Sequence, residues 1–386
     1  MRQRTPILET HQGETMKITD LRTVAVRVPV ERPTAIATRQ LGAREYILVW
    51  IDTDDGHTGI GYTYAGTVGG QAVYDLVKEA LRPLLIGKDP RLIEGHWAAM
   101  YQEVLLTGRR GAAMRAISAI DIALWDLLGK IAGLPLYHLL GGWADTVPAY
   151  ASGGYYRPGD PLDNIREEML SYKAQGFTDF KIKVGGAAFE VDVARVRAAR
   201  EAIGPAGRLA LDANNAWRWP YEAIRFARAV EDCDIWWLEE PLSPEDVAGH
   251  AEIARTLEMP VATGEIHATR WDFRALIEQQ AADILQPDAG VLGGITEWLK
   301  VAHTAASFNL PVAPHWHANL HVHLVAAVAN CLTVEYFVLE QDIYNFERLV
   351  TPETRLRPQD GMLPLPTAPG LGIAFDEPAI QRWQKA

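Results

Sequence analysis

Short apolar or β-branched runs alternate with helix-like stretches over the second half of the chain, from about residue 147 onward. Eight of these runs have the length and composition of strands. They are VPAYASG, FTDFKIKV, RLALDAN, IWWLEEP, PVATGEI, ADILQPDAG, LPVAPHW and LTVEYFVLE. Strands that alternate with helices form parallel sheets, and eight of them predict an α/β fold of the (β/α)8-barrel type.

The segment after the eighth run lacks the pattern of a closing barrel helix. It reads YNFERLVTPETRLRPQDGMLPLPTAPGLGIAF and is rich in Pro and Gly, which interrupt helices. We therefore expect a (β/α)7β modified TIM barrel over residues 144–342. The remaining C-terminal segment, residues 343–386, is expected to return to the N-terminal domain.

Strand patterns come before helical ones in the N-terminal part of the chain. Residues 17–30 and 45–65 have the alternation of a β-meander, and a helical region follows from about residue 71 to 131. Its densest part, GAAMRAISAIDIALWDLLGK, is apolar on more than one face, which is typical of a helix buried between domains. We expect an α+β capping domain over residues 16–143.

Composition narrows the class of function. The net charge of −12 argues against a nucleic-acid partner, because such proteins carry basic patches. No apolar run approaches the roughly 18 residues of a membrane span, so no membrane partner is expected. Residues 1–15 lack the apolar core of a secretory signal and are expected to be a disordered extension. Cys233 and Cys331 stand in no metal-binding spacing and predict reduced core thiols of a cytoplasmic protein.

Three acidic residues close three successive strand candidates. Glu239 follows Asp212 by 27 positions, and Glu265 follows Glu239 by 26. Residues at the carboxyl ends of parallel barrel strands meet at one rim, where the active sites of such barrels lie. Carboxylate oxygens are hard ligands that suit Mg²⁺ or Mn²⁺. In the pair Glu239-Glu240 only one side chain can point inward; we choose Glu239 and expect Glu240 to form a salt bridge at the rim.

Two groups able to transfer protons flank this triad in the sequence. Lys181 and Lys183 stand two positions apart on one strand, so both face the barrel mouth, and a metal with a second ammonium would lower the pKa of one toward neutrality. Asp288 ends the sixth strand candidate, and His315 follows 27 positions later in the seventh. An aspartate beside a histidine fixes its tautomer. A substrate at the metal would then have a lysine on one face and a histidine on the other.

Further polar residues fall on the same rim. Asn214 shares the face of Asp212 and is a candidate substrate contact. His317 shares the face of His315 and could also reach the substrate. Glu335, on the eighth strand candidate, stands alone in an apolar segment, where a buried acid is more often functional than structural.

These motifs together resemble those of the enolase superfamily, in its mandelate racemase-like branch. The likeness covers about residues 16–386 and includes the segment AMRAISAIDIALWDLLGKIAGLPLYHLLGG. The active-site motifs match in chain order: Lys181-x-Lys183, Asp212-x-Asn214, Glu239-Glu240-Pro241, Gly264-Glu265, Gln286-Pro287-Asp288, Pro314-His315 and Glu335.

The resemblance implies a role for each of these residues. Asp212, Glu239 and Glu265 would bind Mg²⁺, which holds the carboxylate of a small-molecule substrate. Lys183 would be the base on one face of the substrate, and Lys181 would contact the carboxylate. His315 with Asp288 would be the second acid or base, and Glu335 would hydrogen-bond the developing enediolate.

The resemblance also implies that two capping-domain loops close over the site. They would be residues 33–45 and 62–70, and the Gly content of the second suits a moving element. Arg39, Arg44, Tyr62 and Tyr64 lie in them and are candidate substrate contacts. The protein is expected to form a homo-oligomer.

Dehydration of an acid sugar is the reaction that we favour. An aldonate or aldarate would lose the proton α to its carboxylate and then its β-hydroxyl, giving a 2-keto-3-deoxy acid. The expected lid carries polar Thr, Arg and Gln in place of a bulky apolar patch, and HWHANLH suits a polyhydroxy acid. Racemisation or epimerisation by the same Lys/His pair is the alternative. Cycloisomerisation is less expected, because that branch usually carries a lysine in place of the Asp288–His315 pair. A silent barrel that only binds a ligand is the remote alternative.

Overall fold

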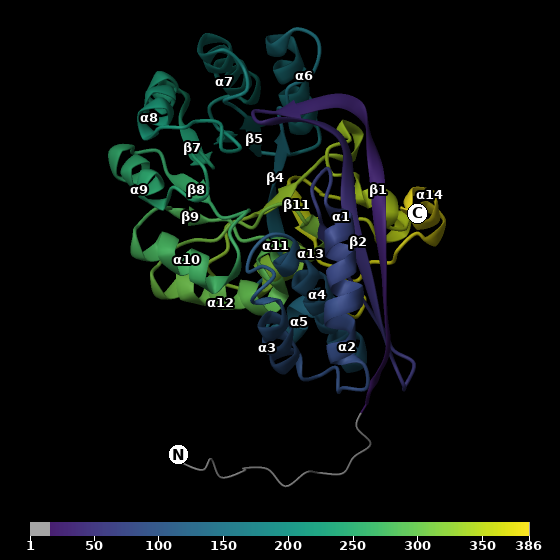
Figure 1. The fold of residues 1–386 in the computed structure, drawn as a ribbon. Helices are drawn as coiled ribbons and strands as arrows, with labels where there is room; N and C mark the ends of the chain where they lie inside the picture. The colour runs from purple at the N-terminus through teal and green to yellow at the C-terminus, as the bar shows by residue number, and fades with distance from the viewer. Residues whose placement is uncertain (1–15, 386) are drawn as a thin grey trace, which may run out of the picture.

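A computed structural model of the protein describes residues 16–385, so the extension expected over residues 1–15 lies outside the described residues. Seven parallel strands form the barrel wall in the order β10-β4-β5-β6-β7-β8-β9. They are β4 (Thr146–Gly153), β5 (Asp179–Lys183), β6 (Arg208–Asp212), β7 (Ile235–Glu239), β8 (Val261–Thr263), β9 (Ile284–Leu285) and β10 (Val334–Tyr336). Five of them, β4, β5, β7, β8 and β9, are labelled in Figure 1. The seventh expected strand, at residues 310–316, is reduced to Val312, which bridges Leu285 on one side and Cys331 on the other and thereby closes the barrel.

Helices cover the outside of the barrel wall. They are α6 (Pro161–Ala174), α7 (Phe189–Ile203), α8 (Pro220–Ala229), α9 (Val247–Thr256), α10 (Thr269–Glu278), the short α11 (Ala289–Leu292), α12 (Gly294–Ser307) and α13 (Ala318–Ala327). Between β10 and residue 354 the chain forms only short 3₁₀ turns, at Leu339–Gln341, Asn345–Leu349 and Pro352–Thr354. The (β/α)7β barrel predicted from the sequence is therefore confirmed.

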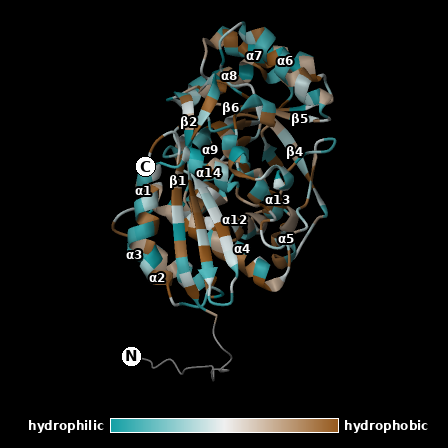
Figure 2. Cartoon of the chain, turned by 90° about the vertical axis from the view of Figure 1, so that its right-hand side faces the viewer, coloured by the Kyte–Doolittle hydropathy of each residue, from teal (hydrophilic) through white to brown (hydrophobic). Residues whose placement is uncertain are grey.

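The N-terminal domain is a three-stranded antiparallel sheet with helices on one side. The strands are β1 (Ile18–Ile36), β2 (Arg39–Thr53) and β3 (Thr58–Tyr64), and hydrophilic and hydrophobic residues alternate along β1 (Figure 2). The helical part comprises α1 (Gly70–Asp75), a π-helix (Leu76–Leu81), α2 (Arg82–Leu85), α3 (Ile93–Val104), α4 (Ala112–Ala132) and α5 (Leu136–Leu139). Gly59 and Gly61 let α4 approach the sheet closely, because a Cβ on either would lie within 2.2 Å of a carbonyl oxygen of that helix.

Helix α4 is buried between the two domains, as its apolar surface predicts. One face packs on β3 and the other on α11 and α12. At the second face, the buried carboxylate of Asp121 accepts hydrogen bonds from the backbone N–H and the hydroxyl of Thr296, at 3.0 and 2.6 Å. The indole of Trp97 donates to the carbonyl of Gly293 at 2.7 Å. These contacts hold the capping domain on the loop that follows β9.

The C-terminal segment contacts both domains. Strand β11 (Met362–Pro364) pairs antiparallel with the start of β4. Helix α14 (Glu377–Trp383) is followed by Lys385, whose backbone N–H donates to Ala25 and whose ammonium lies 2.8 Å from Glu45. The segment thus returns to the capping sheet after touching the bottom of the barrel.

The first of the two expected lid loops is mostly strand. Residues 33–45 lie in β1 and β2, and the only residues between these strands are Ala37 and Thr38. The tip of this hairpin docks on the barrel, since Ala35 and Tyr156 exchange backbone hydrogen bonds of 2.9 and 3.0 Å. Extended pairing of β1 with β2 explains the difference, because it continues through the polar residues that suggested a loop.

Two predictions from composition can be compared with the structure. No helix of residues 16–385 is long and apolar enough to cross a membrane. Both cysteines are free, but only Cys233 is fully buried, and Cys331 is half-buried.

Candidate active site

The three acidic residues predicted from strand spacing meet at the carboxyl end of the barrel. Asp212 ends β6, Glu239 ends β7, and Glu265 follows β8. Asp212 and Glu239 are direct neighbours in the parallel pairing of β6 and β7. One carboxylate oxygen of each of the three residues lies within 4.8 Å of the others. The spacing of about one strand–helix repeat is what brings them together.

This cluster has the chemistry of a site for a hard divalent cation. Burial, together with the neighbouring carboxylates, raises the pKa of Glu265 well above its ordinary value and also raises that of Glu239. Oε2 of Glu265 is buried and has no hydrogen-bond partner among the described residues. Like charges that are held this close in a buried place require a cation, and an all-oxygen donor set fits Mg²⁺.

Lys181 lies beneath the cluster and is fully buried. Its ammonium is 2.5 Å from Oε1 of Glu239, 2.7 Å from Oε1 of Glu335 and 3.6 Å from Oδ2 of Asp212. Burial would lower the pKa of Lys181, but Glu239 and Glu335 outweigh it, and the pKa is raised. Glu335 is therefore not the lone acid expected from the sequence, because Lys181 is its counter-ion.

Lys183 lies one step further out on β5, on the same face. It pairs with Oδ2 of Asp212, its neighbour in the register of β5 and β6, and its ammonium lies 5.0 Å from the centre of the Tyr155 ring. Burial would lower the pKa of Lys183, but the carboxylate of Asp212 raises it above its ordinary value. The lowered pKa expected from the sequence thus depends on a cation that takes up this carboxylate charge.

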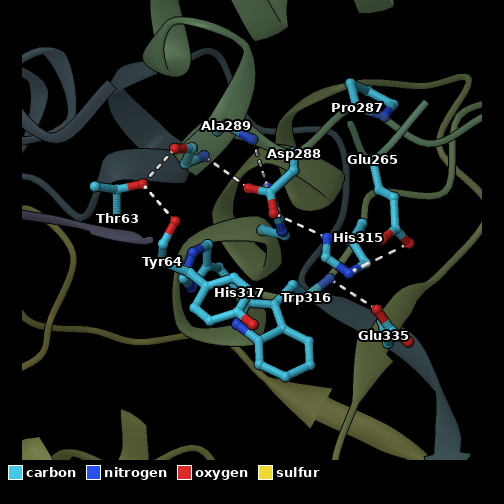
Figure 3. A network of polar contacts seen from close by, with 12 residues as sticks. Thr63, Tyr64, Glu265, Pro287, Asp288, Ala289, His315, Trp316, His317 and Glu335 are labelled. Carbon is cyan, nitrogen blue, oxygen red and sulfur yellow. Dashed lines mark hydrogen bonds and ion pairs between the residues drawn. The ribbon is translucent and has the colours of Figure 1, made fainter. Parts of the chain in front are cut away.

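His315 and Asp288 form the expected pair on the other side of the cluster (Figure 3). Nδ1 of His315 lies 2.9 Å from Oδ2 of Asp288, and Nε2 lies 3.4 Å from Oε2 of Glu265. Burial would raise the pKa of Asp288, but His317, His315 and His321 together lower it. The strands that carry the three acids, β6 to β8, separate β5 from β9. Lys183 and His315 therefore approach the carboxylate cluster from two sides.

Two more of the predicted residues join the site. Oε2 of Glu335 accepts the backbone N–H of Trp316 at 2.8 Å, which links β10 to the residue after His315. Asn214, in a left-handed conformation (φ 43°), donates its backbone N–H to Oδ1 of Asp212 at 2.9 Å, and its own Oδ1 has no partner among residues 16–385. Both arrangements orient a neighbour of the cluster.

Glu240 was expected at the rim in a salt bridge, and this is wrong. The residue is completely buried and adopts φ 43°, which departs from the strand geometry assumed for the alternation argument. Neither carboxylate oxygen has a hydrogen-bond partner within the described part of the chain. Burial, then Asp212 and Glu239, raise the pKa of Glu240 to about 8. It is thus a fourth acid beside the cluster.

Two of the candidate substrate contacts, His317 and Arg39, do not lie at the carboxylate cluster. His317 is turned into the domain interface, where its Nδ1 lies 3.0 Å from the Tyr344 hydroxyl and its ring packs on Tyr62, so the structure does not bring it to the cluster. Arg39 is exposed on the hairpin. The short strand at Val312 explains why His317 does not face the cluster as predicted. The chain leaves strand geometry before His315 and His317, so strand alternation no longer sets the direction of their side chains.

Tyr64 and Arg44 do reach the barrel mouth, through Trp316. The Tyr64 ring stacks on Trp316 with centroids 5.4 Å apart (Figure 3). The Arg44 guanidinium lies 4.4 Å from the centre of the Trp316 ring and donates to the Tyr64 hydroxyl at 3.0 Å. Tyr62 is completely buried below them.

Sequence reasoning missed two side chains that hold Glu239. The indole of Trp237 and the amide of Gln286 both donate to its Oε2, at 3.0 and 2.7 Å. The spacing of Trp237 and Glu239 by two positions on one strand was an available signal. Gln286 directly follows another strand, β9, and no local pattern connects it to Glu239.

Comparisons with known proteins place the chain in a family. Residues 18–141 match the N-terminal domain of mandelate racemase and muconate lactonizing enzyme, and residues 164–379 match the enolase C-terminal domain-like family. The chain is 35% identical to an arabinonate dehydratase of Saccharolobus solfataricus, over 88% of this chain and 91% of the relative. It is 36% identical to a 3,6-anhydro-alpha-L-galactonate cycloisomerase of Streptomyces coelicolor, over 92% and 96%.

A solved structure agrees with the sequence comparisons. L-talarate/galactarate dehydratase of Salmonella typhimurium, liganded with Mg and L-lyxarohydroxamate, superposes with a TM-score of 0.90 at 34% identity, over 99% of this chain and 96% of that one. Both domains and their order along the chain are shared. The protein is an enzyme of the enolase superfamily and belongs to its mandelate racemase-like branch.

Proposed function

We propose that this protein is a Mg²⁺-dependent dehydratase of an acid sugar. The observation that carries the proposal is the placement of Lys183 and of the His315–Asp288 pair on two sides of one carboxylate cluster. Such a site can remove a proton from one face of a carbon and deliver a proton to a leaving group on the other.

Asp212, Glu239 and Glu265 would hold the cation, with Mn²⁺ as a substitute of similar ligand preference. When bound, Mg²⁺ would neutralise the substrate carboxylate and offset the acids that otherwise keep both lysines protonated. Lys181 would hold the same carboxylate from below, since its ammonium already forms ion pairs with two acids at the floor of the site.

Lys183 would remove the proton α to the carboxylate. Its position at the end of β5, with the Tyr155 ring beside it, leaves the ammonium between the cluster and the barrel mouth. Charge would then develop on the substrate oxygens as the enediolate forms. Glu335 would accept or share a hydrogen bond there, because it already bridges Lys181 and the backbone of Trp316.

His315 would protonate the β-hydroxyl as it leaves. Asp288 accepts from Nδ1, so Nε2 is the nitrogen directed at the cluster. Loss of water from the β-carbon converts the enediolate to an enol, and the enol tautomerises to a 2-keto-3-deoxy acid. The proton removed by Lys183 and the one given by His315 balance the reaction.

Two observations favour dehydration over racemisation or epimerisation, in which a proton returns to Cα. Relatives at about one-third identity are named as dehydratases of arabinonate, of talarate and galactarate, and of rhamnonate. The hairpin tip that docks on the barrel is polar and exposed at Thr38, Arg39 and Gln40, which suits a hydroxylated substrate. A racemase or epimerase using the same pair is the alternative, and a barrel that only binds a ligand is remote because no expected side chain is missing.

Cycloisomerisation is a second candidate that deserves a test. Sequence reasoning disfavoured it, yet relatives of 36% and 34% identity are named cycloisomerases, one of an anhydrogalactonate and one of a galactarolactone. The same α-proton abstraction opens a ring when the leaving β-oxygen is part of that ring. No water is then lost.

A screen of acids with a mass readout separates these reactions. The protein with Mg²⁺ would be incubated with aldonates, aldarates and their anhydro acids and lactones in D₂O. Dehydration predicts a 2-keto acid lighter by one water, and cycloisomerisation predicts a product of unchanged elemental composition. Solvent deuterium at Cα of recovered acid without any 2-keto acid would indicate racemisation and would contradict the proposal.

A further inference from the structure

Arg115, in the first turns of α4, is a half-buried cation without a counter-ion. Its guanidinium forms no ion pair with a carboxylate of residues 16–385. Its Nη1 donates to the backbone carbonyl of Tyr64. Nε and Nη2 make no hydrogen bond in the described part of the chain. Neither is among the fully buried polar atoms that lack a partner, so a ligand can reach them. One edge of the guanidinium is therefore fixed, and the other remains available.

Two other buried or half-buried arginines are paired with acids. Arg195 contacts Asp192 at 2.8 Å, and Arg270 contacts Glu297 at 2.9 Å. Arg44 also lacks an acid, but it donates to the carbonyl of Ile343 at 2.7 Å and to the hydroxyl of Tyr64, and it packs on Trp316. Arg115 has only the Tyr64 carbonyl. A desolvated cation without a partner costs free energy, so an external anion is the missing element.

Arg115 lies on the side of the capping domain that faces the reaction site. Its guanidinium carbon is 5.8 Å from the centre of the Tyr64 ring, and that ring stacks on Trp316, the residue after His315. Thr63, next to Tyr64, donates its hydroxyl to the carbonyl of Gly290 at 2.5 Å (Figure 3). This bond holds the end of β3 on the short helix α11, whose N-cap residue is Asp288.

The local electrostatics agree with this placement. Burial lowers the pKa of Arg115, and the partial compensation comes from Asp288, Tyr64 and Glu265. The acids of the site are thus near enough to act on the guanidinium, but none forms an ion pair with it. The group stays charged, because even a lowered arginine pKa lies far above neutrality.

We propose that Arg115 binds the far carboxylate of a diacid substrate, so that the enzyme acts on aldarates in preference to aldonates. This inference rests on the proposed function. The reacting carboxylate belongs at the floor of the site with Lys181 and the three acids. The rest of a sugar chain must extend toward the capping domain, where Arg115 offers two N–H donors. A carboxylate accepts two such donors from one edge of a guanidinium, and a terminal hydroxymethyl group does not.

Matched acids that differ only at the far carbon test this directly. Galactarate would be compared with galactonate, and glucarate with gluconate, in the wild type and in Arg115→Gln. The substitution should lower kcat/KM for the diacid about 10- to 100-fold, mainly through KM, because a charged hydrogen-bonded pair is lost. The monoacid should change less than about threefold. Arg109→Gln, an exposed change of equal charge on the same segment, should leave both unchanged.

Binding provides a readout that does not depend on turnover. In a Lys183→Ala background with Mg²⁺, calorimetry should show tighter binding of the diacid than of the monoacid, and Arg115→Gln should remove that difference. Arg115→Lys keeps the charge without the two-donor edge, so it should remove only part of the binding preference for the diacid. Should the Gln variant not fold, the Lys variant gives the same comparison.

The outcomes separate failure of this inference from failure of the proposed function. The role of Arg115 would be overturned if Arg115→Gln lowered kcat/KM equally for diacid and monoacid, or lowered it for neither. A wild type that prefers monoacids would overturn it too. Each of these outcomes leaves the dehydratase in place. Absence of any 2-keto acid from either class would reject the dehydratase. The calorimetric preference would then still decide whether Arg115 binds a second carboxylate.

Discussion

Nδ1 of His315 lies 2.9 Å from Oδ2 of Asp288, and this contact sets the tautomer of the histidine. Asp288 has a lowered pKa and is ionised, so it can only accept, and Nδ1 must carry the proton. Its other oxygen accepts the backbone N–H of Gly290 at 2.7 Å, which prevents the carboxylate from rotating away. Nε2 is consequently the nitrogen free to exchange a proton with the substrate.

Asp288→Asn should therefore reduce activity strongly without unfolding the protein. The amide oxygen can still accept from Gly290, but the amide nitrogen would then donate to Nδ1 and impose the opposite tautomer. We expect kcat to fall by about 10²–10⁴, the usual worth of a positioned acid or base. The measurement is kcat beside a thermal melt, and activity within about threefold of the wild type would show that the tautomer is irrelevant.

Removal of the cation should abolish turnover and lower thermal stability. A ligand that binds only the folded state stabilises it by about 2.7 kcal/mol at a hundred times its Kd. Mg²⁺ should thus raise the Tm of the wild type, and Glu265→Gln should weaken that rise, since Glu265 supplies one of the three clustered oxygens. Glu278→Gln, an exposed change of equal charge on α10, is the matched control. If Mg²⁺ raised the Tm of both variants equally, Glu265 would not be a ligand of the cation.

Asp121 should make stability depend on pH at the domain junction. Burial raises its pKa from 3.8 to about 7. Between these values the folded state binds more protons than the unfolded state, so this contribution to stability is present below about pH 4 and is lost as the pH rises through about 7. Asp121→Asn cannot ionise. From pH 4 to pH 8 the wild type should thus lose unfolding free energy relative to the variant. A constant difference would contradict the raised pKa.

The hairpin tip should loosen when its backbone pairing with the barrel is removed. Ala35 donates its N–H to the carbonyl of Tyr156, and Ala35→Pro deletes that donor, whereas Ala35→Gly retains it. We expect amides in residues 36–44 and at Tyr156 to exchange about 3- to 10-fold faster in the Pro variant, from the worth of one hydrogen bond. KM should rise if this hairpin covers the substrate. Unchanged exchange in the Pro variant would show that the pairing does not hold the tip.

The barrel and its carboxylate cluster could be predicted because they depend on repeated local patterns. The spacing of Asp212, Glu239 and Glu265 by about one strand–helix unit needs only the rule that parallel strands end at one rim. Lys181 and Lys183 need only the period of two along a strand. Both rules hold where the strands pair in regular register, as β5 and β6 do, and Asp212 and Glu239 remain direct neighbours on β6 and β7.

The errors arise where the backbone leaves that regularity. Glu240 has a positive φ and turns inward behind the cluster, and His317 follows a strand that has shrunk to one bridging residue. Arg115 was not found, because nothing in the helix that bears it marks one side as facing a site on another domain. Contacts between domains depend on docking, which no local period encodes.

Hydrogen exchange at Cα tests the central claim most directly, because it separates the two faces of the site. The acid turned over by the wild type would be incubated in D₂O with Mg²⁺ and either Lys183→Ala or His315→Asn, while melts verify folding. Loss of both turnover and Cα deuteration in Lys183→Ala, with turnover lost but deuteration retained in His315→Asn, is the predicted result. Cα deuteration that persists in Lys183→Ala at the wild-type rate would contradict a lysine base and with it the two-sided site.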